Sequence, residues 1–316
     1  MTQAKTHQNE LERLSALESR AENGGGPQAI TRHHQKGKLT ARERLDLLFD
    51  PDSFVEVHKL AQSQSVDFGM QEKRVPGDGV VTGYGTIEGR LVFAYAQDVT
   101  VLGGSVGTIH GRKICRLMDE AIKVKAPLVA LNDSGGGRLH EGFFASKGVA
   151  GMFYRNTAAS GLIPQITGMM GSSAGVAVYS PALTDFIVMV KGQSHMVITG
   201  PAIIKSVTGE DLGLEELGGA KVHSEITGQA HLVADSDQEC IDIIKRLLGY
   251  LPSNNDEQPP VVSNSDDPYR VDDRIEKIVQ ADFTKSNDMH QVILRVDDNE
   301  DFFEKLPSYA PKIIIW

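Results

Sequence analysis

The chain has 316 residues, of which 40% are apolar and 6% are aromatic, and 32 are glycines. This length suits one large domain or two small ones, and many glycines with few aromatics favour an α/β protein over an aromatic-cored β-sandwich. The net charge of −10 argues against a general nucleic-acid-binding protein.

The two cysteines, Cys115 and Cys240, lie far apart and show no paired spacing. A disulfide framework and a cysteine zinc ribbon are therefore excluded. We find no cleavable signal pattern and no apolar run of membrane-spanning length. The sequence predicts a soluble, cytoplasmic protein.

Residues 1–26 are predicted to form an N-terminal amphipathic helix, ahead of a domain over residues 27–316. Leu11, Leu14 and Leu17 recur at helical spacing, and the run Gly24-Gly25-Gly26-Pro27 ends the pattern. This apolar stripe indicates a packing or subunit-contact element.

A basic stretch follows, with Arg32, His33, His34, Lys36, Lys38, Arg42 and Arg44. In an acidic protein these side chains could serve phosphate groups. They could equally form the solvated face of an amphipathic helix, and the sequence alone does not decide between the two.

From residue 77 the pattern alternates between strands and helices. Strands are predicted over 77–87 and 91–96, and a helix is predicted to open at 103–105 and to end at Pro127. Buried strands follow over 128–131, 163–166 and 186–190, with a loop at 168–175 and then a helix that ends near residue 183. This order predicts an α/β, mostly parallel layered fold.

The character of the chain changes after residue 252. Residues 252–270 are polar and rich in turn formers, which predicts an irregular segment that wraps over the surface. Short helices are predicted near 273–280 and 287–304.

Two glycine loops, residues 134–137 and 171–175, follow predicted buried strands. Glycine lets the backbone adopt positive φ and approach a ligand closely, so that successive N–H groups can converge on one oxygen. Such donors stabilise an enolate or a tetrahedral oxyanion on a thioester without a side-chain acid, base or metal. Tight turns that are needed only for packing would leave the same pattern.

Serine catalysis is not favoured, although Ser134, Ser172 and Ser173 lie in these loops. The sequence has no Gly-x-Ser-x-Gly elbow, and nothing in it pairs a serine with one of the histidines His110, His140 or His195. It also has no histidine pair at metal-binding spacing, no Walker A motif and no G-x-G-x-x-G fingerprint, so neither a metal site nor nucleotide hydrolysis is predicted.

Six segments, in this order, resemble signatures of the β-type carboxyltransferase subunits of biotin-dependent acyl-CoA carboxylases and decarboxylases. They are residues 36–44 (KGKLTARER), 98–105 (DVTVLGGS), 132–138 (NDSGGGR), 179–186 (YSPALTDF), 198–201 (ITGP) and 216–223 (ELGGAKVH). The resemblance runs from about residue 10 to the end. It leans towards the propionyl-CoA carboxylase β chain and the methylmalonyl-CoA decarboxylase α chain.

The resemblance implies a crotonase-like (ClpP-like) ββα superhelix that binds a short acyl-CoA. CO₂ would pass between carboxybiotin and the α-carbon of the acyl group, through an enolate. The biotin would be carried on a partner, either a biotin carboxyl carrier protein that works with a biotin carboxylase or the subunits of a membrane decarboxylase. A homo-oligomer, dimeric or larger, is implied as well.

The resemblance also implies which residues form the site. The backbone N–H groups of Gly136, Gly137, Gly175 and Val176 are expected to hold the enolate oxygen. Contacts with CoA are expected from Gly103, Gly104, Ser105, Ser134, Gly135, Gly171, Ser173 and Ala174, and no metal is expected.

This sequence departs from the family pattern in length and in its loops. It stops where the family enters a second carboxyltransferase domain, so a separate chain that carries that domain is an expected partner. The family usually has Ala at Gly137, Gln at His140, Pro-Cys at Ser172-Ser173 and Gly at Val176. Two alternatives therefore stay open: a biotin-independent, crotonase-like decarboxylase of a malonyl-type thioester, and a structural subunit without activity.

Overall fold

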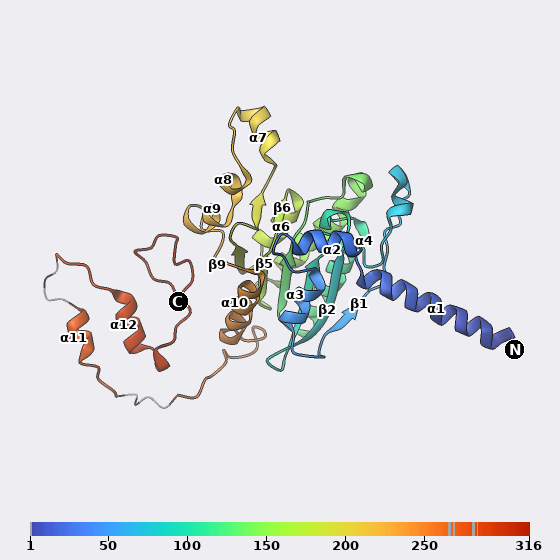
Figure 1. Cartoon of the computed structure of the whole chain (residues 1–316). Helices are drawn as coiled ribbons and strands as arrows, with labels where there is room; N and C mark the ends of the chain where they lie inside the picture. Colours follow the sequence, from blue (N-terminus) through green and yellow to red (C-terminus); the bar gives the residue numbers. More distant parts are fainter. Residues whose placement is uncertain (1, 265–266, 268, 280–281, 283) are drawn as a thin grey trace.

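A seven-stranded sheet forms the centre of the computed structural model, which describes residues 2–264, 267, 269–279, 282 and 284–316 (Figure 1). The first three strands in the sheet pair antiparallel, and from β3 onward all neighbours pair parallel. The order across the sheet is β1 (Val55–Val57), β2 (Val80–Ile87), β3 (Arg90–Gln97), β4 (Leu128–Asn132), β5 (Gln165–Met169), β7 (Phe186–Val190) and β9 (Leu232–Ala234).

A second, two-stranded parallel sheet consists of β6 (Ser172–Ala174) and β8 (His195–Val197). Only two residues lie between the end of β5 and the start of β6, so the chain passes from the large sheet to the small one at the second glycine loop. The predicted loop over 168–175 is therefore wrong, because β5 continues to Met169 and residues 172–174 pair as a strand.

Helices cover both faces of the large sheet, as the predicted layered α/β fold requires. On one face α3 (Ala41–Leu48) and α10 (Asp237–Tyr250) pack against Val129 and Leu131 of β4. On the other face α4 (Thr108–Val124) and α5 (Ser146–Ala159) pack against Leu128 and Ala130. Successive residues of β4 thus face opposite cores, which explains why this strand is apolar throughout.

The remaining helices are short, apart from the first. They are α1 (Thr2–Glu22), α2 (Pro27–His34), α6 (Val176–Ala182), α7 (Pro201–Thr208), α8 (Leu214–Gly218), α9 (Ala220–Glu225), α11 (Arg274–Ile278) and α12 (Met289–Val296), with 3-10 turns at Asp67–Lys73, Leu102–Gly104, Leu139–Ala145 and Asp298–Glu300. Figure 1 shows α1 extending away from the sheet, and Leu11 and Leu14 on it are 66% and 42% exposed. Within the described residues no helix is both long and apolar enough to cross a membrane.

Two predicted helices differ in extent from those observed. Helix α4 begins at Thr108 and not at 103–105, because Gly103 and Gly104 adopt positive φ angles of 65° and 63° in the 3-10 turn that precedes it. The helix predicted over 287–304 is confined to α12, which ends at Val296.

The segment after α10 has neither helix nor strand over residues 252–264, and its side chains are exposed from residue 255 onward. The predicted irregular segment 252–270 includes residues 265, 266 and 268, and the predicted helix 273–280 includes residue 280. These four residues lie outside the described part of the chain.

Candidate functional site

The two glycine loops lie against each other at the ends of β4 and β5. A Cβ atom placed on Gly136 would be 2.7 Å from the carbonyl oxygen of Ala174, and one placed on Gly137 would be 3.4 Å from Cγ2 of Val176. Gly136 and Gly175 have φ angles of 97° and 57°, which a side chain would strain. The structure therefore brings together Gly136, Gly137, Gly175 and Val176, the four donors that the resemblance implies, from two separate loops.

The N–H groups of these four residues are engaged to different degrees. Gly175 donates to the carbonyl oxygen of Val197 at 2.9 Å, and Gly136 donates to Oγ of Ser134 at 3.3 Å. For Gly137 and Val176 we find no acceptor within the described residues, and Val176 opens α6, where the helix itself offers none. The two N–H groups without an acceptor among the described residues therefore come one from each loop.

The residues expected to contact CoA line the same region but differ in exposure. The turn at 103–105 is bound to the first loop: Gly135 donates its N–H to the carbonyl of Gly103 at 2.8 Å, and the Ser134 hydroxyl donates to the carbonyl of Gly104 at 2.7 Å. Gly103 and Gly135 are exposed and Ser105 is half-buried.

The other expected CoA contacts are less accessible. Ser134, Gly104, Gly171 and Ser173 are buried, and Ala174 is half-buried. The Ser173 hydroxyl has no hydrogen-bond partner within the described residues.

The buried side chain of Arg44 bonds to residues that flank both glycine loops. The Nε of Arg44 donates to Oδ2 of Asp237 at 2.9 Å, and its guanidinium also donates to the carbonyl of Met170 at 3.1 Å and lies 3.5 Å from Oδ2 of Asp133. Nζ of Lys38 is 3.4 Å from the same Asp133 oxygen. Both cations therefore face inward, towards carboxylates that follow β4 and open α10, and are not available as a phosphate-binding face.

A second buried arginine fixes the far end of the first loop. Arg138 donates to Oδ1 of Asp78 at 2.6 Å, to Oε1 of Glu141 at 3.1 Å and to the carbonyl of Ser105 at 2.8 Å. Burial raises the pKa of Asp78, although Arg138 acts to lower it. Burial also acts to raise the pKa of Glu141, but hydrogen bonds from Thr108 and other donors hold it below its ordinary value. Sequence reasoning had not assigned Arg138 this positioning role.

Comparison with known proteins agrees with this geometry. The family described as the carboxyl transferase domain matches residues 32–315. The chain belongs to this family. It is 49% identical to the methylmalonyl-CoA decarboxylase subunit alpha of Veillonella parvula over 98% of this chain, and 46% identical to the mitochondrial propionyl-CoA carboxylase beta chain of Sus scrofa over 96%.

A solved structure supports the same assignment. The transcarboxylase 12S structure with methylmalonyl-coenzyme A and methylmalonic acid bound superimposes with a TM-score of 0.94 at 43% identity and covers 97% of this chain. The predicted crotonase-like carboxyltransferase fold is thereby confirmed. The chain spans 61% and 57% of the two relatives and 60% of the transcarboxylase chain, about three fifths in each case.

This carboxyl transferase domain also contains a hydrogen-bonded group that sequence reasoning missed. Oγ of Ser172 on β6 is 2.8 Å from Nδ1 of His195 on β8, and Nε2 of His195 is 2.9 Å from Oε1 of Glu215 on α8. The sequence shows no sign of this pairing of a serine with a histidine. The pairing arises because Ser172 and His195 are opposite each other in the parallel register of two strands that were not predicted.

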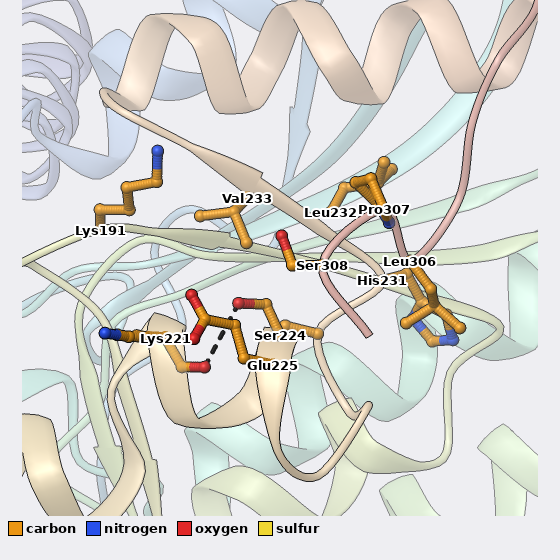
Figure 2. Close-up of a pocket in the computed structure, with 11 residues that line it drawn as sticks. Lys191, Lys221, Ser224, Glu225, His231, Leu232, Val233, Leu306, Pro307 and Ser308 are labelled. Atoms are coloured by element: carbon orange, nitrogen blue, oxygen red, sulfur yellow. Dashed lines mark hydrogen bonds between the residues drawn. The ribbon is translucent and has the colours of Figure 1, made fainter. Parts of the chain in front are cut away.

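A pocket of about 470 Å³ lies elsewhere in the domain, between β9, α9 and residues 306–308 (Figure 2). Ser224 and Glu225 of α9 form one wall, and Lys191, Lys221 and Ser308 lie around it. None of its lining residues belongs to the glycine loops, so the pocket is separate from the candidate site.

Proposed function

We propose that this chain is the acyl-CoA-binding part of a carboxyltransferase that moves a carboxyl group to or from the α-carbon of a short acyl-CoA of the propionyl-CoA or methylmalonyl-CoA type. The observation that carries the proposal is the pair of N–H groups at Gly137 and Val176. They come from two loops whose backbones are in contact, and both loops are held by buried arginines.

These N–H groups suit an enolate. When a carboxyl group leaves the α-carbon, or before one is added to it, negative charge develops on the thioester oxygen. Donors that are already fixed in place stabilise this charge without reorganisation, and the loss of one such donor typically costs about 10²–10³ in rate. The role of Gly137 and Val176 is to hold that oxygen, so the site needs no metal for this step.

Biotin, carried on a partner protein, would supply or accept the carboxyl group. The two N–H donors suit a thioester oxygen, and we assign no biotin contact to the described residues. The names of the relatives support the proposed acyl group. The same proposal includes the partner proteins, a second carboxyltransferase domain and an oligomeric assembly. A cytoplasmic location remains a prediction from the sequence.

The experiment that tests the proposal removes the N–H donor of residue 176. A control variant changes the side chain at the same position but keeps the N–H. Val176→Pro deletes the N–H at the first position of α6, where proline fits the helix and no helical hydrogen bond is lost. Val176→Ala keeps the N–H. Calorimetric titration of the parent chain should show tighter binding of propionyl-CoA than of free CoA.

Val176→Pro should reduce that preference by roughly three- to tenfold, the contribution of one hydrogen bond, whereas Val176→Ala should retain it. In an assay reconstituted with a biotin-carrying partner and the second domain, the proline variant should lose about 10²–10³ in carboxyl transfer. An unchanged acyl preference in Val176→Pro would refute the role of this N–H. If the parent binds neither ligand, the structural-subunit alternative would be favoured.

A further inference from the structure

Ser172, His195 and Glu215 are aligned in the order that a nucleophilic serine needs. The Glu215 carboxylate accepts a hydrogen bond at Nε2 of His195, which places the ring proton on Nε2. Nδ1 then carries the lone pair, and the Ser172 hydroxyl donates to it at 2.8 Å. A serine is activated when an adjacent base accepts its proton and a third group orients that base.

The exposure of the three side chains fits this order. Ser172 is exposed to solvent, the His195 side chain is only 10% exposed, and the Glu215 side chain is 53% exposed. The nucleophile can therefore be reached from outside, while the base is held between its two partners. A serine that served only to satisfy a buried histidine would not need to be accessible.

This group is separate from the pair of N–H donors at Gly137 and Val176. Ser172 is on β6 and its Oγ faces His195 of β8, whereas the two donors are backbone N–H groups of Gly137 and of Val176, the first residue of α6. The two groups share no residue, and a small ester requires neither CoA nor biotin. Reaction at Ser172 can therefore be measured independently of carboxyl transfer, and the inference does not depend on the proposed function.

We infer that Ser172 is an acyl-accepting nucleophile, with His195 as its base and Glu215 as a positioning residue, and that it hydrolyses small acyl esters and thioesters. Oγ of Ser172 attacks the acyl carbonyl carbon, the C–O bond forms, and the bond to the leaving thiol or alcohol breaks. The Ser172 proton passes to Nδ1 of His195 and then to the leaving group. Water attacks the acyl-serine and gives its proton to His195, which releases a carboxylic acid and restores the serine.

The test uses the full chain with two probes, a fluorophosphonate that labels activated serines and p-nitrophenyl acetate as a small ester. Mass spectrometry of the labelled protein should place the phosphonate on Ser172. Ser172→Ala should lower the rates of labelling and ester hydrolysis at least a hundredfold, and His195→Gln at least tenfold. Ser206→Ala removes an exposed serine on α7 and should leave both rates unchanged.

Two further comparisons separate this role from a structural one. Glu215→Gln keeps an oxygen that accepts the Nε2–H and should retain more of the rate than Glu215→Ala, with the same melting temperature in both variants. Equal rates in these two variants would overturn the positioning role of Glu215. Labelling of the parent that is no faster than labelling of Ser172→Ala, with both proteins folded by circular dichroism, would overturn the inference as a whole.

Discussion

Contact between the two glycine loops makes Gly136→Ala the most informative single substitution. The backbone of Gly136 has φ 97°, and a non-glycine residue in such a region costs roughly 1–3 kcal/mol. The new Cβ would lie 2.7 Å from the carbonyl oxygen of Ala174, so one loop must shift, and overpacking of this kind costs about 1–3 kcal/mol more. We expect a loss of about 2–6 kcal/mol in the free energy of unfolding, a large part of the total for most proteins.

Urea unfolding measures this loss, and two other glycines serve as matched controls. Gly142 also has a positive φ of 54°, but a Cβ there meets no atom of the described residues within 4 Å, so Gly142→Ala should show only the conformational cost of about 1–3 kcal/mol. Gly137 has an ordinary φ, and its Cβ would be 3.4 Å from Val176, so Gly137→Ala should cost less than about 1 kcal/mol.

The difference between Gly136→Ala and Gly142→Ala isolates the clash between the loops. Gly136→Ala should also reduce the preference for propionyl-CoA over free CoA in calorimetry, because the N–H of Gly137 moves with the loop. Equal destabilisation by the two substitutions, within about 0.5 kcal/mol, would refute the reasoning.

Three further predictions concern other residues. Burial lowers the pKa of His110 from 6.5 to about 3, so the unfolded chain binds more protons than the folded chain between these values. Stability should therefore fall below about pH 6.5, by about 2 kcal/mol at pH 5, and urea unfolding of His110→Gln should show a weaker dependence on pH in this range. Arg44→Met leaves the buried Asp237 without its cation and should cost about 3–5 kcal/mol in urea unfolding, whereas Arg32→Met, at an exposed position, should change stability by less than about 0.5 kcal/mol. Val176→Gly removes the side chain beside the two donors and should favour longer acyl chains over propionyl-CoA in calorimetry; an unchanged ratio of affinities would contradict this.

The sequence predicted the layered fold because the strands that form it carry a strong signal. Residues 128–131 and 186–190 are continuous apolar runs, which parallel strands with two covered faces require. The family signatures fixed the type of fold beyond what periodicity alone allows. Strands β6 and β8 have three residues each, too few to show a period, and both were missed.

The same limit explains which part of the site could be predicted. The positions of the two loops followed from glycine runs after apolar strands. The sequence could not show which N–H groups already have an acceptor, because Gly175 donates to Val197, which lies on the unpredicted strand β8. The link from Ser172 to His195 depends on the register of that small sheet and could not be predicted either. Glycine runs after apolar strands thus located the loops, whereas the hydrogen-bond partners of their atoms required the tertiary structure.

The contacts of Arg44 beside the two glycine loops have a consequence for the order of folding. Arg44 bonds to a carboxylate 193 positions later in the chain, and the loops it supports follow strands from the middle of the sequence. Contacts between such distant parts form late, because the loop-closure entropy must be overcome first. We expect a refolding chain to recover its helical circular dichroism signal early and acyl-CoA binding only when α10 has docked. A nascent chain that ends before residue 237 lacks the carboxylate that Arg44 bonds to, so we expect its thioester site not to form.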